Sequence, residues 1–148
     1  MVDAYYRETA LQDALIAMLN SGVLPEGHSA AGPGTTPAVG VCVVEVLPPA
    51  AGFTSLMGGP SFAGADFQTS CVGRDAAHAR KFGALVRQAI TERDWRGPFI
   101  NPIVTDHLRV DDVDHRTGFL QQDKGTNTWV GDYRASYQAT QPPVIPSS

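Results

Sequence analysis

The side chains best suited to chemistry meet where a strand-like run ends and a helix-like run begins, in FQTSCVGRDAAHARK at residues 67–81. Cys71 offers a thiol and His78 an imidazole. A catalytic thiol needs a nearby base, and it needs a cation or a helix N-terminus that favours the thiolate. Cys71, however, falls on the inward face of the alternating run, and His78 falls on the flank of the helix. This pattern favours a buried structural cysteine over a nucleophile.

The turn VGRD between the two runs does not have the composition of a phosphate site. It contains one glycine, and Asp75 occupies the helix cap, where its carboxylate satisfies N–H groups and repels phosphate. The chain has no match to the pattern G-x-x-x-x-G-K-[ST]. GPGTTPAVG lacks the strand-before, helix-after context of a dinucleotide loop, and GHSAA is a poor match to the hydrolase elbow G-x-S-x-G.

A group of acidic and imidazole side chains follows in the last third of the chain. Carboxylates and imidazoles are metal ligands, yet no two of these residues have a recognised spacing such as H-E-x-x-H. A run of aspartates in a loop is more typical of a solvated turn or a charged rim. We therefore predict no metal, no cofactor and no catalytic residue, and hence a protein that is not an enzyme. The group comprises Asp106, His107, Asp111, Asp112, Asp114 and His115.

The composition limits the class of protein. The 148 residues suit one domain with its own core, 43% of them are hydrophobic, and the 15 glycines and 11 prolines indicate many loops. The net charge of −4 lacks the basic excess of a free-standing nucleic-acid binder. Cys42 and Cys71 lie in apolar strand-like runs and are expected to be reduced and cytosolic. We find neither a signal-peptide pattern nor an apolar run that could span a membrane.

Hydrophobic periodicity predicts two helices. The first runs from about Asp3 to Asn20, and the second begins at Asp75 and continues for about five turns. We expect both to pack against a sheet. The inward stripe of the first helix is Ala4, Leu11, Ala14, Leu15 and Met18, with Leu19 beside it, and that of the second is Ala76, Ala79, Phe82, Gly83, Val86, Ala89 and Ile90.

Strands are predicted at residues 39–47, 67–72, 103–110 and 129–140. Loops are predicted at 25–38, 50–65 and 111–128, the last with a hairpin in part. The fold class is therefore α+β, a mainly antiparallel β-sheet packed against an N-terminal helix and a central amphipathic helix, with long loops. We expect a single domain over residues 1–141, followed by a Pro-rich tail at 142–148.

Two further features indicate contacts between molecules. The Gly-rich segment 50–65 carries Phe53, Leu56, Met57 and Phe62 without a clear period, which fits packing on a neighbouring subunit or an internal flap. Basic residues gather around the second helix. Without an overall basic excess, they indicate a solvated face or a salt-bridging subunit contact rather than a DNA site. They are Arg74, Arg80, Lys81, Arg87, Arg93 and Arg96.

The order of these elements resembles the tail terminator, or tail completion, proteins of long, non-contractile-tailed bacteriophages. The resemblance rests on ALQDALIAML in the first helix, on VGVCVVEVL, on FQTSCVGRDAAHARKFGALVRQAI and on the closing strand DYRASYQAT. It covers residues 3–140 and is sharpest at 67–90 and 132–140. The segment 48–65 and the loop 111–128 depart from a compact version of the pattern.

The resemblance implies a structural virion protein that needs no cofactor and catalyses no reaction. Such proteins form a hexameric ring on the head-proximal end of the tail tube, stop its polymerisation and join the tail to the head connector. DNA passes through the lumen without sequence-specific binding. The implied partners are further copies of the chain, the major tail tube protein and the connector, adaptor or head-closure protein. The implied location is the virion neck, after assembly in the host cytoplasm.

Under this interpretation, some of Asp111, Asp112 and Asp114 line the lumen or its rim, where carboxylates repel phosphates and let DNA slide. Three other interpretations compete with it. They are another neck component, such as a head-closure or adaptor protein, a small thiol or metal enzyme, and a small-ligand-binding α+β domain.

Overall fold

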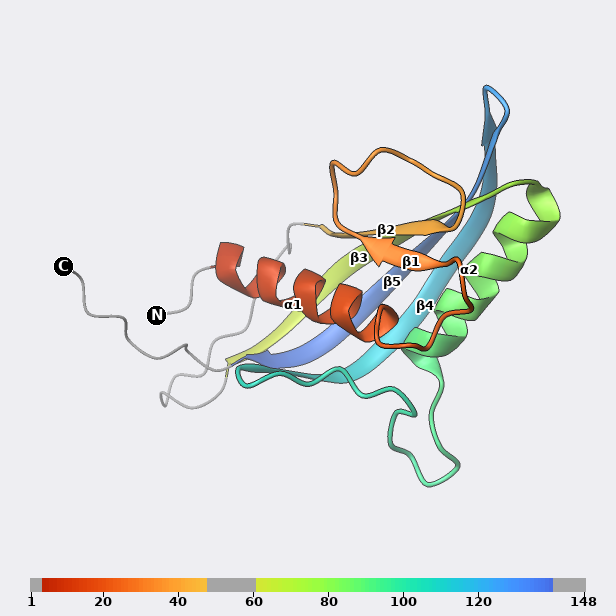
Figure 1. Ribbon diagram of the computed structural model, residues 1–148. Helices are drawn as coiled ribbons and strands as arrows, with labels where there is room; N and C mark the ends of the chain where they lie inside the picture. Colours follow the sequence, from red (N-terminus) through yellow and green to blue (C-terminus); the bar gives the residue numbers. More distant parts are fainter. Residues whose placement is uncertain (1–3, 48–60, 140–148) are drawn as a thin grey trace.

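The computed structural model describes residues 4–47 and 61–139, which form two helices and one five-stranded sheet (Figure 1). The strand order is β1-β2-β3-β5-β4, and neighbouring strands are antiparallel except β1 and β2. The predicted α+β class is confirmed. The elements are α1 (Ala4–Leu19), β1 (Ser29–Ala31), β2 (Val41–Val46), β3 (Ser61–Gly73), α2 (Ala76–Thr91), β4 (Leu108–Asp123) and β5 (Thr126–Ala139).

Both helices pack against the same face of the sheet. α1 contacts β1 and β2, α2 contacts β3, β5 and β4, and the two helices touch one another (Figure 1). The side chains between helices and sheet form one core cluster that includes Leu15, Phe67, Phe82 and Tyr133. In the described part of the chain no helix covers the opposite face. The fold therefore has two layers, and one face of the sheet is left to solvent or to a partner.

The predicted inward stripes of the two helices are confirmed where their side chains are described. In α2 the stripe is buried except for Ala76, which is partly exposed. Neither helix of the described chain is long and apolar enough to cross a membrane. The buried positions are Leu11, Ala14, Leu15, Met18 and Leu19 in α1, and Ala79, Phe82, Gly83, Val86, Ala89 and Ile90 in α2.

The junction between β3 and α2 depends on Gly73 and Asp75. Asp75 caps the helix, as predicted, because its Oδ1 accepts a 2.7 Å hydrogen bond from the backbone N–H of His78. Gly73 does not have a positive φ. Instead, a Cβ at this position would collide with the backbone of Ala79. The glycine therefore permits the first turn of α2 to approach the end of β3.

A second glycine brings α2 close to β5. A Cβ at Gly83 would collide with the indole ring of Trp129. A Cβ at Gly118 in β4 would lie 2.8 Å from another carbon of the same indole ring. Trp129 therefore packs against both the helix and the edge strand, and a glycine in each makes room for it.

The loop predicted at 111–128 is wrong, because β4 extends to Asp123. The hairpin predicted for part of this segment is confirmed, since β4 turns directly into β5. The turn residues Lys124 and Gly125 both have positive φ, as a tight hairpin requires. Two register shifts, around Asp111 and Arg116, interrupt the alternation by which a strand is recognised. The strand predicted at 103–110 begins only at Leu108.

Two other loop predictions also need correction. Residues 61–65 begin β3, since the whole of this strand pairs with β5, from Ser61 opposite Ala139 to Gly73 opposite Asn127. β1 lies within the predicted loop 25–38 and has only three residues, which pair in parallel with β2.

The four apolar residues proposed for subunit contacts are largely outside the described residues. This holds for Phe53, Leu56 and Met57. Phe62 lies opposite Gln138 in the β3–β5 pair, but its side chain is not among those described. Their role in subunit contacts stays a prediction, as do the single domain 1–141 and the tail 142–148.

We expect Gly73→Ala to lower the free energy of unfolding by about 1–3 kcal/mol, because the added methyl group has to displace the backbone of α2. Chemical denaturation followed by circular dichroism measures this loss. Gly32→Ala is the matched control, since its Cβ would be in ordinary contact, 3.5 Å from the Gln12 amide nitrogen. Equal stability of the two variants would show that α2 does not depend on this close approach.

Candidate functional site

The helix-free face of the sheet carries polar side chains that are bonded to one another. Glu45, Gln68, Asp132 and Thr117 form one row across β2, β3, β5 and β4. The Asp132 carboxylate accepts hydrogen bonds of 3.0 Å from Gln68 Nε2 and from Thr117 Oγ1. These bonds link side chains of three neighbouring strands, β3, β5 and β4.

Acidic groups outnumber basic groups on this part of the face. In the row next to Asp132, Arg134 lies between Asp66 and Asp114 and forms an ion pair with Asp66 at 3.1 Å. Asp114 is in none of the ion pairs of the described chain. The carboxylates are Glu45, Asp66, Asp111, Asp112, Asp114 and Asp132, against the guanidinium groups of Arg109, of Arg134 and of Arg93, which reaches Asp112 from the loop after α2. We call this region the acidic half of the open face.

The three aspartates predicted to lie at a lumen or rim all belong to the edge strand β4. Asp112 lies opposite Ser136 and Asp114 opposite Arg134, and both are exposed. Asp111 is the extra residue at a register shift, and its carboxylate accepts hydrogen bonds from Gln138 Nε2 (2.8 Å) and Arg109 Nε (3.1 Å). Within the described residues no three His, Cys, Asp or Glu side chains are grouped to hold a metal ion.

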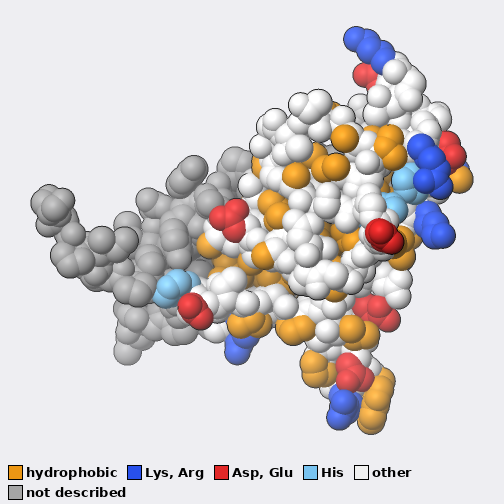
Figure 2. All heavy atoms as spheres, in the orientation of Figure 1, with side chains coloured by type: hydrophobic (Ala, Val, Ile, Leu, Met, Phe, Trp, Pro, Cys, Tyr) orange, Lys and Arg blue, Asp and Glu red, His pale blue; other side chains and the backbone are white. Residues whose placement is uncertain are grey.

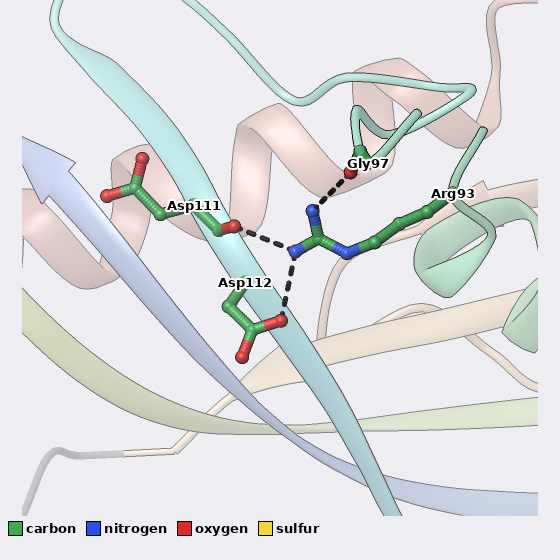
Figure 3. A network of polar contacts seen from close by, with 4 residues as sticks. All are labelled: Arg93, Gly97, Asp111 and Asp112. Atoms are coloured by element: carbon green, nitrogen blue, oxygen red, sulfur yellow. Dashed lines mark hydrogen bonds and ion pairs between the residues drawn. The ribbon is translucent and has the colours of Figure 1, made fainter. Parts of the chain in front are cut away.

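Arg93 fastens the loop between α2 and β4 to this edge strand (Figure 3). Its guanidinium group donates to the backbone oxygens of Gly97 (2.8 Å) and Asp111 (2.9 Å) and to Oδ1 of Asp112 (3.0 Å). It also lies 3.9 Å from the ring centroid of Phe99. Because the ion pair is exposed it adds little stability, but the planar fork of donors fixes the position of the loop.

Toward the β4–β5 turn, the same face of the sheet becomes apolar. Val43, Ser70, Val130 and Phe119 form one row across the four longer strands. Val72 and Val130 are buried, although they are not part of the core cluster beneath the helices. Phe119 is 49% exposed. The open face is therefore divided into an acidic half and an apolar half.

A pair of histidines lies beside a cavity at the N-terminal end of α2. The Nε2 atoms of His28 and His78 are 2.9 Å apart. The backbone N–H of Arg74 donates to Nδ1 of His78 (3.0 Å), so His78 must carry its proton on Nε2 and donate it to His28. His28 then donates from Nδ1 to the carbonyl oxygen of Glu26 at 3.1 Å. This chain of hydrogen bonds requires both rings to be neutral.

The cavity has a volume of about 350 Å³ and is lined by both apolar and basic side chains. The ring of His28 packs edge-on against Phe82, with 4.7 Å between the centroids. In Figure 2, histidine and basic side chains gather on the side of the molecule where α2 begins. The lining residues are Pro25, His28, Arg74, Asp75, Ala77, His78, Lys81, Phe82 and Leu85.

The geometry around Cys71 agrees with its predicted structural role. Cys71 lies directly opposite Cys42 in the β2–β3 pair, both thiols are free and buried, and their Sγ atoms are 3.3 Å apart. The hydrogen bond to Cys42 and burial raise the pKa of Cys71, which is the opposite of what a nucleophile requires. His78 is bonded to His28 instead of serving the thiol.

The His28–His78 contact and the position of Trp95 were not predicted. His28 lies in a segment predicted as a loop, fifty residues before its partner, so no local pattern indicates the contact. Trp95 lies in a turn in which Gly97 N–H donates to the Asp94 carbonyl oxygen (2.8 Å), and its side chain is 91% exposed. For Trp95 a signal exists in the sequence WRGP, since Gly-Pro predicts a turn at the surface.

No protein-family model and no curated protein matches this chain. Among solved structures, a chain from the virion of a native gene transfer agent particle has the same fold. The two chains share 17% sequence identity and align with a TM-score of 0.51, and the alignment covers 92% of each. At this identity the similarity establishes the fold.

We expect acidification to weaken the contact between residues 20–28 and α2. Desolvation, and then the charge of Arg74, lower the pKa of His78 below its usual 6.5. The unfolded chain therefore binds this proton more readily, so stability present above about pH 6.5 is lost as the pH falls through the folded pKa. The free energy of unfolding, measured from about pH 8 to pH 5, should fall more steeply in wild type than in His78→Gln.

The variant keeps a residual slope, because burial also lowers the pKa of His115. His115→Gln is therefore the control that removes a titrating histidine but leaves the His28–His78 bond in place. If His78→Gln retained the full wild-type slope, the neutral pair would not contribute to stability.

Proposed function

We propose that this chain is a structural protein of a phage-type virion and that it acts as the tail terminator. In this role, copies of the chain form a ring, with six subunits as in the family that it resembles. The ring caps the finished tail tube, stops its polymerisation and joins the tail to the head connector. DNA passes through the lumen of the ring.

The observation that carries the proposal is the fold shared with a virion chain over 92% of both chains. Agreement along nearly the whole length supports a shared fold rather than a single shared motif. The element order that resembles tail terminators over residues 3–140 supports the narrower role within such a particle.

The open face of the sheet suits a channel wall. A wall around DNA needs side chains that stay solvated and do not bind phosphate, because each cation that binds phosphate holds the strand. Glu45 and Asp114 are exposed in the acidic half and are in no ion pair of the described residues, whereas Asp112 is paired with Arg93 and Arg134 with Asp66. The opposite face is used for the core, so this face can line a lumen without any change in the fold.

Another neck component, such as a head-closure or adaptor protein, is the main competing role, because it too would be a ring subunit of a virion. A thiol enzyme is less well supported, since the Cys71 thiol is buried against Cys42 and its pKa is raised. The partner that the ring binds distinguishes the terminator from the other neck proteins.

Mixing the protein with purified tail tubes should give rings at one end of each tube only, visible by negative-stain electron microscopy. Tubes grown in its presence should be shorter or uniform in length, because the cap stops addition of subunits. Binding to isolated connectors with bare tube ends would contradict the terminator role and favour a head-closure or adaptor protein.

The channel assignment can be tested by reversing charge on the open face. We expect Glu45→Lys with Asp114→Lys to leave tube capping intact but to reduce the DNA delivered per particle, because lysines on the wall bind phosphate. Asp13→Lys with Glu26→Lys is the matched control, since it makes the same change in charge at exposed positions of α1 and the following loop. If both double variants delivered the same amount of DNA per particle, Glu45 and Asp114 would not line the channel.

A further inference from the structure

The loop between α2 and β4 presents a tryptophan on a fixed support. Arg93 binds Gly97, Asp111 and Asp112, and Asp94 N–H donates to the carbonyl oxygen of Pro98 at 2.7 Å. In Figure 1 this loop projects from the molecule below the end of α2, and in Figure 2 the projection carries hydrophobic side chains beside charged ones.

Trp95, at the tip of this turn, is 91% exposed, and Ile100 in the same loop is 52% exposed. A large aromatic side chain exposed on a hydrogen-bonded turn is typical of an interface anchor, because the backbone that carries it is already ordered before binding.

The other end of α2 offers a complementary site. The cavity of about 350 Å³ beside His28 and His78 is large enough for an indole ring, and Phe82 and Leu85 contribute its apolar wall. Arg74 and Lys81 lie at the same cavity, where a cation can pack on an aromatic face. The carboxylate of Asp75 provides an acceptor for the indole N–H.

The N-terminal half of α2 carries more positive than negative charge. Arg74, Arg80 and Lys81 lie there against the single carboxylate of the cap Asp75, and Glu92 occupies the C-cap, where an anion is unfavourable. Neither the three cations nor Glu92 is in an ion pair within the described part of the chain. A partner that places carboxylates near the first end and a cation near the second would neutralise these charges.

The Trp95 side of the molecule meets this requirement. The two basic residues of its loop are already neutralised, Arg93 by Asp112 and Arg96 by Asp94. At the end of α2, Glu92 is an exposed carboxylate that is in no ion pair of the described residues, and Arg87 lies more than one turn before it. A second copy placed head to tail would bring this carboxylate to the cationic end of the next α2.

We propose that copies of this chain assemble head to tail, with Trp95 of one copy in the cavity formed by His28, His78, Phe82 and Leu85 of the next. The two contact surfaces are different and lie at opposite ends of a helix of about 24 Å, so the contact is heterologous and its repetition gives a ring when the rotation closes. The inference rests on the proposed function for the ring and specifies its subunit contact.

Cysteine pairing tests this contact without removing Trp95. Arg96→Cys places a thiol beside the tryptophan, and Ala77→Cys places one at the exposed side of the cavity. A mixture of the two single variants, on capped tubes and in free solution under mild oxidation, should give a disulfide-linked dimer. The native thiols do not compete, since Cys42 and Cys71 are buried.

Adding Trp95→Ala to the Arg96→Cys chain should reduce the cross-linked product at least about tenfold, as loss of an anchor residue does. Thr126→Cys, at the far end of the β4–β5 hairpin, replaces Arg96→Cys as the positional control and should not cross-link to Ala77→Cys. Fluorescence gives a second measurement, because burial of Trp95 should shift its emission to shorter wavelength on assembly.

Failure of this contact can be distinguished from failure of the proposed function. Capped tubes without the 96–77 disulfide would overturn the head-to-tail contact and leave the terminator role standing. A disulfide-linked oligomer that caps no tube would support the contact and contradict the role. A yield that Trp95→Ala does not change would overturn the contact, since the tryptophan would then not be its anchor.

Discussion

The close approach of α2 to the sheet is the contact on which the rest of the structure depends. Gly73 and Gly83 remove side chains at the two places where the helix meets the strands, and Trp129 fills the space that remains. Because the helix lies this close, Phe82, Val86 and Ile90 are fully buried. α1 completes the layer over β1 and β2, so the core is finished on one face of the sheet and the open face is free of any role in it.

The surface features follow from this one-sided packing. The open face carries hydrogen-bonded polar rows and an acidic excess, whereas the two ends of α2 carry a cavity and an anchored loop. These three regions point in different directions. The proposed ring requires such a division, because each subunit in it meets one neighbour on each side and presents a third surface to the channel.

Periodicity predicted both helices, the Asp75 cap and the alternation of residues 67–72, because these segments bury one clear stripe. It missed most of β4, since Asp112, Asp114 and Thr117 face solvent and register shifts move the alternation out of phase.

Periodicity missed residues 61–65 of β3, because Gly64 is typical of a turn in the sequence. Its strand conformation is evident only from its pairing with Ser136 in β5. The cavity at His28 could not be predicted, since it depends on tertiary contact between distant segments. Whether Asp111, Asp112 and Asp114 line a lumen remains a prediction.

The two-layered fold has a consequence for how such a protein changes over evolutionary time. Substitutions beneath the helices are constrained by volume, as the collisions at Gly73 and Gly83 show. Substitutions at the exposed polar positions of the open face meet no such constraint, so the charge there can change while the backbone stays the same. A fold built in this way can be formed by very different sequences, as the 17% identity with a chain of the same fold illustrates.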